Sequence, residues 1–219
     1  MSGQISIQVA TSSQVMNWSP VPPFLPAAQP PAITVNGLAI QPSTTAPTPT
    51  GFQLVVFDIT QTIPTPASIL VNEWLSVFPA GNDSNLWTYY GSIYEGLVND
   101  LLSYGNPANQ LMILASFGLD ADMAPDNEAY ATMFNYGGGN QLQTWMKSCD
   151  PGSQVGNPTS WVSFPANYIL VGLAGVGYGG GSEIYQAAQS SQNSIKSSLN
   201  VNVSQDRKVR VSEAEAVSA

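Results

Sequence analysis

The feature that most constrains the fold is a pair of apolar runs in the second half of the chain. The first run, LMILASF, occupies residues 111–117, and the second, YILVGLAG, occupies residues 168–175. Apolar runs of this length, bounded by turn residues, predict buried strands. An acidic loop and a helical pattern lie between the runs, and glycines follow the second one. The remainder of the chain is therefore expected to pack around these two strands.

The first half of the chain adds further strand patterns. Residues 5–10 alternate Ile, Ile and Val with Ser and Gln, which is the period of a half-buried strand. In AITVNGLAI, residues 32–40, the Asn36-Gly37 pair suits the positive φ angles of a type I′ turn and predicts a hairpin. Other strands are predicted at residues 52–59, the central one, and at 69–78, 161–164 and 168–173.

Two helices are predicted. Residues 84–105 place large apolar side chains at three- and four-residue intervals, the spacing that buries one face of a helix. This stripe is interpreted as core, and it consists of Trp87, Tyr90, Tyr94, Leu97 and Leu101. The second helix covers residues 125–136, with Pro125 in its first turn, and a further turn is expected at residues 142–148. The order of elements predicts an α+β or α/β class with a sheet flanked by few helices.

Composition divides the chain into one domain and a tail. Residues 20–31 hold six prolines and predict an extended connection, since proline interrupts helices and central strands. From residue 189 onward the chain is rich in Gln, Ser and Asn and then in mixed charge. We therefore expect a single domain over residues 1–188 and a flexible tail over residues 189–219.

The charges argue against nucleic acid and anionic membranes as partners. Only 9% of the residues are charged, against about 25% in typical soluble domains. Lys147 is the one basic residue among the first 194, which contain eleven acidic residues. Neutralising several phosphates takes several lysines or arginines on one face. The N-terminus lacks the basic and apolar regions of a Sec signal peptide, and the apolar runs are too short for a membrane-spanning helix.

The chain also lacks the residues that most enzymes and metal sites use. It contains no histidine, which rules out a Ser-His-Asp triad and the commonest zinc ligand. Cys149 is the single cysteine, so no intramolecular disulfide can form. The sequence therefore predicts a protein that is not an enzyme and that holds no cofactor.

Two motifs suggest ligands but have simpler interpretations. Residues 175–180 satisfy G-x-G-x-x-G, yet a dinucleotide site also needs a following helix and a second strand, so a close-packed glycine turn is the preferred interpretation. An acidic cluster could bind calcium or supply a carboxylate pair for glycoside hydrolysis, but its spacing does not fit an EF-hand, and turn and helix-capping roles are the default. That cluster consists of Asp120, Asp122, Asp126 and Glu128.

Aromatic and acidic residues near predicted strand ends suggest a sugar site. A ring can stack on the apolar face of a sugar while carboxylates and amides bind its hydroxyls. The residues placed this way are Asp120, Trp161, Tyr168 and Tyr178. For each of these residues taken alone, packing is the preferred interpretation.

Five segments can be taken together, in order along the chain: ISIQVATSS, AITVNG and GFQLVVFD near the start, then LMILASFGLDADMAPDNEAYATMF, and finally ANYILVGLAGVGYGGGSE. They span roughly residues 5–186, and their order and spacing resemble those of the interleukin-like EMT-inducer (ILEI, FAM3) domain family. The resemblance implies a compact lectin-like sandwich of two β-sheets with flanking helices and without catalytic activity. It further implies carbohydrate binding or recognition of a cell-surface partner, with Asp120, Asp122, Trp161 and Tyr168 as the site.

This chain departs from the family pattern in two respects. Family members commonly carry disulfides, and the sugar-binding member uses two arginines that have no counterpart here. The alternative to a recognition domain is a structural subunit of a bacterial or phage surface, fibre or tail assembly, including a homo-oligomer. The low charge and the Pro/Thr-rich loops favour that alternative, because such surfaces suit repeated protein contacts.

Overall fold

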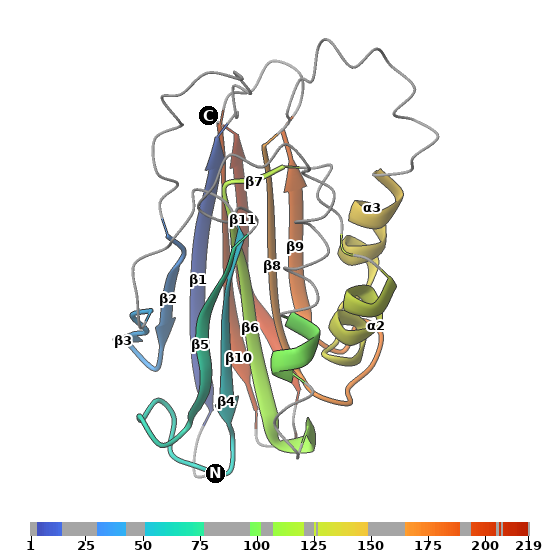
Figure 1. Cartoon of the computed structure of the whole chain (residues 1–219). Helices are drawn as coiled ribbons and strands as arrows, with labels where there is room; N and C mark the ends of the chain where they lie inside the picture. Colours follow the sequence, from blue (N-terminus) through green and yellow to red (C-terminus); the bar gives the residue numbers. More distant parts are fainter. Residues whose placement is uncertain are drawn as a thin grey trace, which may run out of the picture.

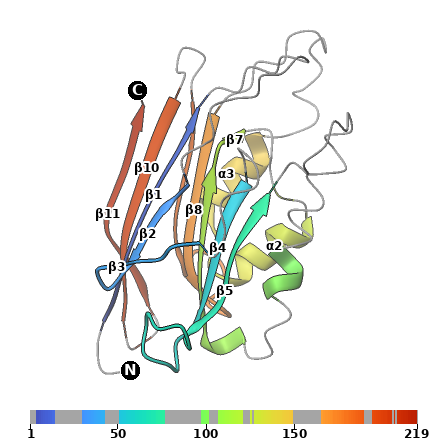
Figure 2. The same ribbon diagram turned by 60° about the vertical axis from the view of Figure 1, so that its left-hand side comes forward.

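The computed structural model describes residues 4–14, 30–42, 51–76, 97–101, 107–120, 125, 127–148, 165–188, 194–204, 206 and 208–218. These residues form three layers (Figures 1 and 2): an outer sheet, a central sheet and a layer of helices on the far side of the central sheet. Every strand pairing between elements is antiparallel. The predicted α+β class is therefore confirmed in its sheet-rich form.

The central sheet has six strands in the order β5-β4-β6-β8-β7, with β9 also paired to β8. Its strands are β4 (Gly51–Asp58), β5 (Ile69–Ser76), β6 (Gln110–Phe117), β7 (Leu119–Asp120), β8 (Pro165–Leu173) and β9 (Ser182–Ala187). The two apolar runs of the sequence are the adjacent strands β6 and β8, paired from Leu111 with Leu173 to Ala115 with Ile169. All residues of both strands are buried, as predicted.

Two separate cores explain why these strands are apolar throughout. Successive side chains of a strand point to opposite faces, so a sheet covered on both sides needs apolar residues at every position. On β6, Leu111, Ile113 and Ala115 face the outer sheet, whereas Met112 and Leu114 face the helices. β4 and β8 divide their side chains in the same way.

The outer sheet is covered on one side only. Its order is β11-β10-β1-β2-β3, with β1 (Ile5–Gln14), β2 (Ala32–Val35), β3 (Leu38–Ala39), β10 (Ser194–Val203) and β11 (Val209–Ser218). Ile5, Ile7 and Val9 of β1 are buried and the polar residues between them are exposed, as the alternation predicts; further along the strand the buried positions are Thr11 and Ser13. The predicted hairpin is β2–β3, and its turn residues Asn36 and Gly37 have φ values of 51° and 79°, as a type I′ turn requires.

The prediction of a flexible tail over residues 189–219 is wrong for its described part. Residues 194–203 form β10, which lies between β1 and β11 and pairs with β1 along ten residues. Alternate side chains of β10 are buried against the central sheet: Ile195, Ser197, Leu199, Val201 and Val203. Serine and asparagine between them gave the segment a polar composition, which concealed its period of two.

The helix layer contains α2 (Asn127–Asn135) and α3 (Asn140–Ser148), and the 3-10 turn η1 (Pro107–Asn109) precedes β6. α2 confirms the helix predicted at 125–136, and α3 extends the turn predicted at 142–148. Of the helix predicted at 84–105, residues 97–101 are described and helical, with Leu97 and Leu101 buried as expected. The strand predicted at 161–164 and most of the Pro-rich connection at 20–31 lie outside the described residues.

Glycines allow the helix layer to approach the central sheet backbone to backbone. A Cβ on Gly172, in the middle of β8, would lie 1.6 Å from the carbonyl oxygen of Tyr136 at the end of α2. The amide of Gly181 donates to the carbonyl of Gly137 at 3.1 Å. The G-x-G-x-x-G segment leads into strand β9, which returns along β8, so no helix follows it as a dinucleotide site would need. The interpretation as a glycine turn is confirmed, but close packing is found only at Gly180: Gly175, Gly177 and Gly179 have positive φ angles and open space around them.

Gly172→Ala is therefore expected to lower the free energy of unfolding by about 3 kcal/mol or more, because backbone atoms of Tyr136 must move. Gly175→Ala is the matched control: its φ of +79° strains a Cβ, but no atom lies within 4 Å, so about 1–2 kcal/mol is expected. Urea denaturation of both variants measures the difference. Equal losses would show that the close approach at Gly172 is unimportant.

Candidate functional site

Tyr168, one of the predicted sugar-binding residues, lies in the core between β8 and α3. Its side chain is fully buried, and its hydroxyl donates a hydrogen bond of 2.8 Å to Oε2 of Glu183. Burial raises the pKa of Tyr168 well above its ordinary value, and the nearby Glu183 carboxylate raises it further. The ring has no exposed face on which a sugar could stack, which corrects this part of the predicted site.

Glu183 connects β9 to the beginning of α3. Its Oε1 accepts hydrogen bonds of 2.9 Å from the amides of Gly139 and Gln141, and its Oε2 accepts one of 3.1 Å from the amide of Leu142. These amides lie in the first turn of α3, where backbone donors lack helical partners and the helix dipole favours a negative charge. Glu183 thus caps α3 from strand β9, and the hydroxyl of Tyr168 in β8 is a fourth donor to the same carboxylate.

An aromatic cluster packs around Trp145 of α3. The Trp145 ring stacks on Tyr185 with centroids 5.7 Å apart and lies 5.1 Å from the ring of Tyr168. Phe52 of β4 lies 6.3 Å away on another side. Trp145 is fully buried, so these contacts hold α3 on the central sheet. The Glu183 cap and the Trp145 cluster are structural.

The other predicted site residues are not brought together among the described residues. The backbone of Asp120 pairs with Pro165 in the short strand β7, while Asp122 and Trp161 lie outside the described residues. Tyr178 is 45% exposed at the glycine turn, and its hydroxyl donates to Oδ1 of Asn140.

Within the described ranges, no three His, Cys, Asp or Glu residues gather as metal ligands. Of the acidic cluster, Glu128 is exposed on α2, and Asp126 also lies outside the described part.

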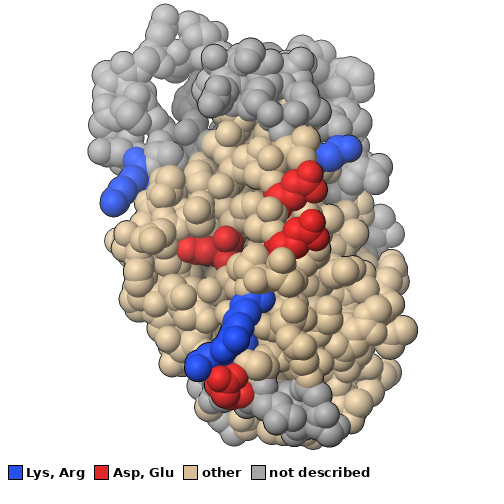
Figure 3. All heavy atoms as spheres, turned by 180° about the vertical axis from the view of Figure 1, so that it is seen from behind, with Lys and Arg blue, Asp and Glu red and all other residues tan. Residues whose placement is uncertain are grey.

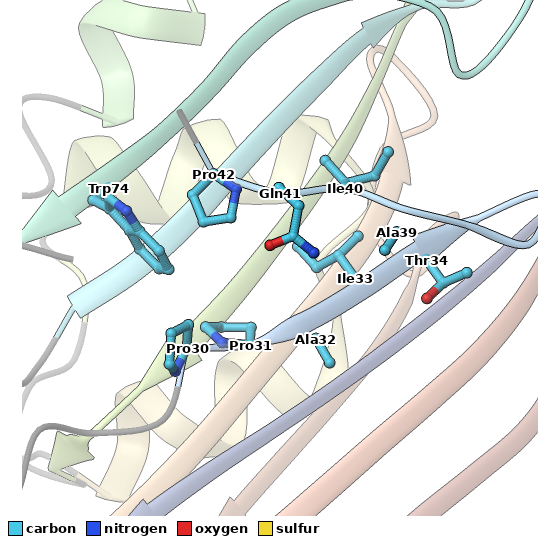
Figure 4. Close-up of a pocket in the computed structure, with 10 residues that line it drawn as sticks. All are labelled: Pro30, Pro31, Ala32, Ile33, Thr34, Ala39, Ile40, Gln41, Pro42 and Trp74. Carbon is cyan, nitrogen blue, oxygen red and sulfur yellow. The ribbon is translucent and has the colours of Figure 1, made fainter. Parts of the chain in front are cut away.

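A groove opens between the two sheets at the edge formed by β5 and the β2–β3 hairpin (Figure 4). Its volume is about 520 Å³. It is lined by Pro30, Pro31, Ala32, Ile33, Thr34, Ala39, Ile40, Gln41, Pro42 and Trp74. We call it the Trp74 groove. The sequence did not single out Trp74, which lay within a predicted strand.

The groove exists because the outer sheet is short on this side. Its last strand, β3, has two residues, so no strand of the outer sheet in the described part of the chain continues over the end of β5. Trp74 pairs with Gln53 across β4 and β5, and its ring packs edge-on against Phe117 at 5.0 Å. The indole remains partly exposed. One part of the ring is therefore fixed by packing, and the rest faces the groove.

Amide side chains beside the groove form a short chain of hydrogen bonds. Asn72 Nδ2 donates to the carbonyl of Gln41 at 2.7 Å, and Gln53 Nε2 donates to Asn72 Oδ1 at 3.1 Å. The other end of the Gln53 amide, Oε1, is buried and has no hydrogen-bond partner among the described residues. A buried acceptor without a partner costs about 1–3 kcal/mol and calls for an explanation such as water or a ligand.

No protein-family model matches the sequence, and a search of curated proteins finds no significant match. The resemblance to the ILEI domain family therefore stays a prediction. Among the described residues, no helix is long and apolar enough to cross a membrane.

The Glu183 cap generates a stability prediction. Glu183→Ala removes the acceptor of four hydrogen bonds, and we expect it to lower the free energy of unfolding by about 3 kcal/mol. Tyr168→Phe removes one bond to a charged group and should cost about 2 kcal/mol. Glu128→Ala, at an exposed carboxylate in the first turn of α2, is the control and should cost less than about 1 kcal/mol. If Glu183→Ala lowers the free energy of unfolding by no more than Glu128→Ala does, the capping role of Glu183 is refuted.

Buried tyrosines generate a prediction on alkaline stability. Burial raises the pKa of Tyr136 to about 12, and its hydroxyl donates to Oε1 of Gln110. The folded protein therefore keeps this proton above pH ~10, where the unfolded chain loses it. The free energy of unfolding should fall as pH rises from about 10 to 12, and less steeply in Tyr136→Phe. Denaturation curves of wild type and Tyr136→Phe measured across this pH range test the prediction. An equal pH dependence of the free energy of unfolding in the two proteins would contradict it.

Proposed function

We propose that the chain is a non-enzymatic recognition domain that binds carbohydrate in the Trp74 groove. The observation that carries the proposal is a partly exposed indole, fixed at its edge by Phe117, in an open hollow of about 520 Å³. Pockets for small ligands have volumes of about 300–1,000 Å³. An aromatic face that is held in place suits the apolar face of a sugar ring, because little side-chain entropy is lost on binding.

Polar groups around the groove suit hydroxyls. Thr34 and Gln41 line it, and the amide chain through Asn72 to Gln53 lies behind it. Amides and hydroxyls both donate and accept hydrogen bonds, as sugar hydroxyls do. The described residues that line the groove include no charged side chain, and the whole chain carries a net charge of −9. Neutral glycans are therefore the proposed ligand class, since the overall field opposes sulfated or sialylated ones.

A glycan array with the full chain tests the proposal. We expect wild type to bind neutral glycans and Trp74→Ala to lose at least tenfold in affinity. Stacking of a nucleic-acid base on an aromatic side chain is worth about 1–3 kcal/mol, and we expect a comparable value for stacking of a sugar ring on Trp74. Gln41→Ala should weaken binding less, and it keeps the backbone carbonyl to which Asn72 donates. Tyr178→Ala is the matched control because it removes an exposed ring outside the groove lining.

The melting temperature of each variant shows whether the groove survives, since Trp74 also packs on Phe117. A wild-type protein that binds no glycan at high concentration would overturn the proposal. Equal losses in Trp74→Ala and Tyr178→Ala would also overturn it, because they would place the ligand elsewhere.

A second candidate function, a subunit of a protein assembly, is supported by a different part of the molecule. β11 ends the outer sheet, and residues 210–217 of this strand are all exposed. Exposed strand edges of this length are sites at which sheets of different chains join. This feature lies at the edge of the outer sheet opposite to β3, so the two functions do not compete for one surface.

A further inference from the structure

The edge strand β11 lacks several features that keep sheet edges from associating, although it carries charged side chains and one irregularity in its pairing. It has ten residues and no proline, whereas β3, at the other edge of the same sheet, has two residues. Val211 and Val217 are 52% and 43% exposed, which makes them two of the most exposed large apolar side chains among the described residues. Figure 2 shows β11 along the margin of the molecule. Natural monomers usually shorten, charge or cover such an edge.

We propose that β11 pairs antiparallel with β11 of a second copy of this chain, so that two outer sheets join into one continuous sheet. The proposal rests on the second candidate function, assembly, and is independent of carbohydrate binding. In a two-fold symmetric pair of strands, every contact occurs twice: if one residue lies opposite a second residue of the other copy, the second lies opposite the first on the other side of the axis. The strand's own pattern of faces and charges then limits the register.

The pairing with β10 shows which way each β11 side chain points. Val209 and Val211 lie opposite the buried residues Val203 and Val201, so they face the side of the central sheet. Beyond an irregularity that leaves Ser212 as an additional residue, Ala214 lies opposite the buried Leu199 and faces the same side.

The remaining β11 residues follow from the alternation of the strand. Ala216 shares the side of the two valines and Ala214. Arg210, Glu213, Glu215 and Val217 point to the opposite, outer side. β11 therefore carries an apolar inner side and a charged outer side.

One symmetric register keeps these sides matched along the strand. With Ser212 opposite Glu213 of the second copy, Val211 lies opposite Ala214 and Val209 lies opposite Ala216. Apolar side chains then meet on the inner side. A one-residue slip would place inner residues opposite outer ones. The additional residue Ser212 therefore lies next to the two-fold axis.

Charge complementarity supports the same register. It places Arg210 opposite Glu215 of the second copy, and the symmetry gives this pair twice. Glu213 is already held within the sheet, because Asn200 Nδ2 donates to its Oε2 at 3.0 Å. A pair centred on Ala214 would instead place Glu213 opposite Glu215, and like charges in direct opposition are unfavourable. Figure 3 shows the molecule from behind, with a few acidic and basic side chains interspersed over the face seen there.

The interface is a single strand pair with small side chains, so the dimer is expected to be weak and to form at high protein concentration. The exposed ion pairs specify the register more than they supply affinity. This makes charge reversal the sharpest test of the proposal.

The experiment is sedimentation velocity of the full chain over a range of concentrations. Wild type should pass from monomer to dimer, and Arg210→Glu and Glu215→Arg should each weaken dimerisation at least tenfold, because like charges then meet twice. An equimolar mixture of the two variants should form a heterodimer in which every Glu meets an Arg. This heterodimer should restore association to near the wild-type level.

The matched control is Lys147→Glu, which makes the same charge reversal at an exposed position on α3 and should dimerise like wild type. A monomer at all concentrations would overturn the proposal, as would a dimer that Arg210→Glu leaves unchanged or a mixture that shows no rescue. The charge variants should bind glycans like wild type, because the Trp74 groove lies at the other edge. A failed array and a failed dimer test are therefore distinguishable.

Discussion

The structure depends on a central sheet that is buried on both faces. Because every residue of β4, β6 and β8 except Asp58 is buried, these strands can contain hardly any polar side chain without a partner. The hydroxyl of Ser116 accepts a hydrogen bond of 2.8 Å from the backbone amide of Tyr168, within the central sheet. Asn167 accepts a hydrogen bond from Ser13 and donates one to Ser197, both in the outer sheet. The Asn167 bonds therefore tie the two sheets together where apolar packing alone would allow sliding.

The helix layer is held by backbone contact and by one carboxylate. Glycines at 137–139 and 179–181 allow two loops to touch through main-chain atoms, and Gly172 lets the end of α2 lie directly on β8. Glu183 then fixes the first turn of α3 from β9. The glycines that resemble a nucleotide motif and the acid that follows them thus serve one purpose, which is the docking of two helices on a sheet.

The sequence predicted the elements whose hydrophobic pattern or turn residues allow a single interpretation. The buried runs, the Asn36-Gly37 hairpin and α2 were predicted because their periods and turn residues are unambiguous. β10 was missed because its outward residues are serine and asparagine, and β11 because nearly all of its residues are exposed. Such a strand has no pattern of buried residues that a sequence could reveal, because its backbone hydrogen bonds to β10 hold it in place. Tyr168 was misplaced because an aromatic residue near a strand end has the same local sequence whether it lies in a core or at a surface.

The Trp74 groove and the exposed β11 edge have a common origin in the way the two sheets are stacked. β10 lies over β8 and β9, and β11 contacts β9, the last strand of the central sheet, so β11 extends to or beyond that margin. At the opposite margin the outer sheet ends early, at the two-residue β3, and leaves Trp74 of β5 partly uncovered. An outer sheet centred over the central one would cover the indole and also bury the inner side of β11. The offset between the sheets therefore creates both candidate binding surfaces, and it explains how one small fold can present the Trp74 groove and the exposed β11 edge at opposite ends.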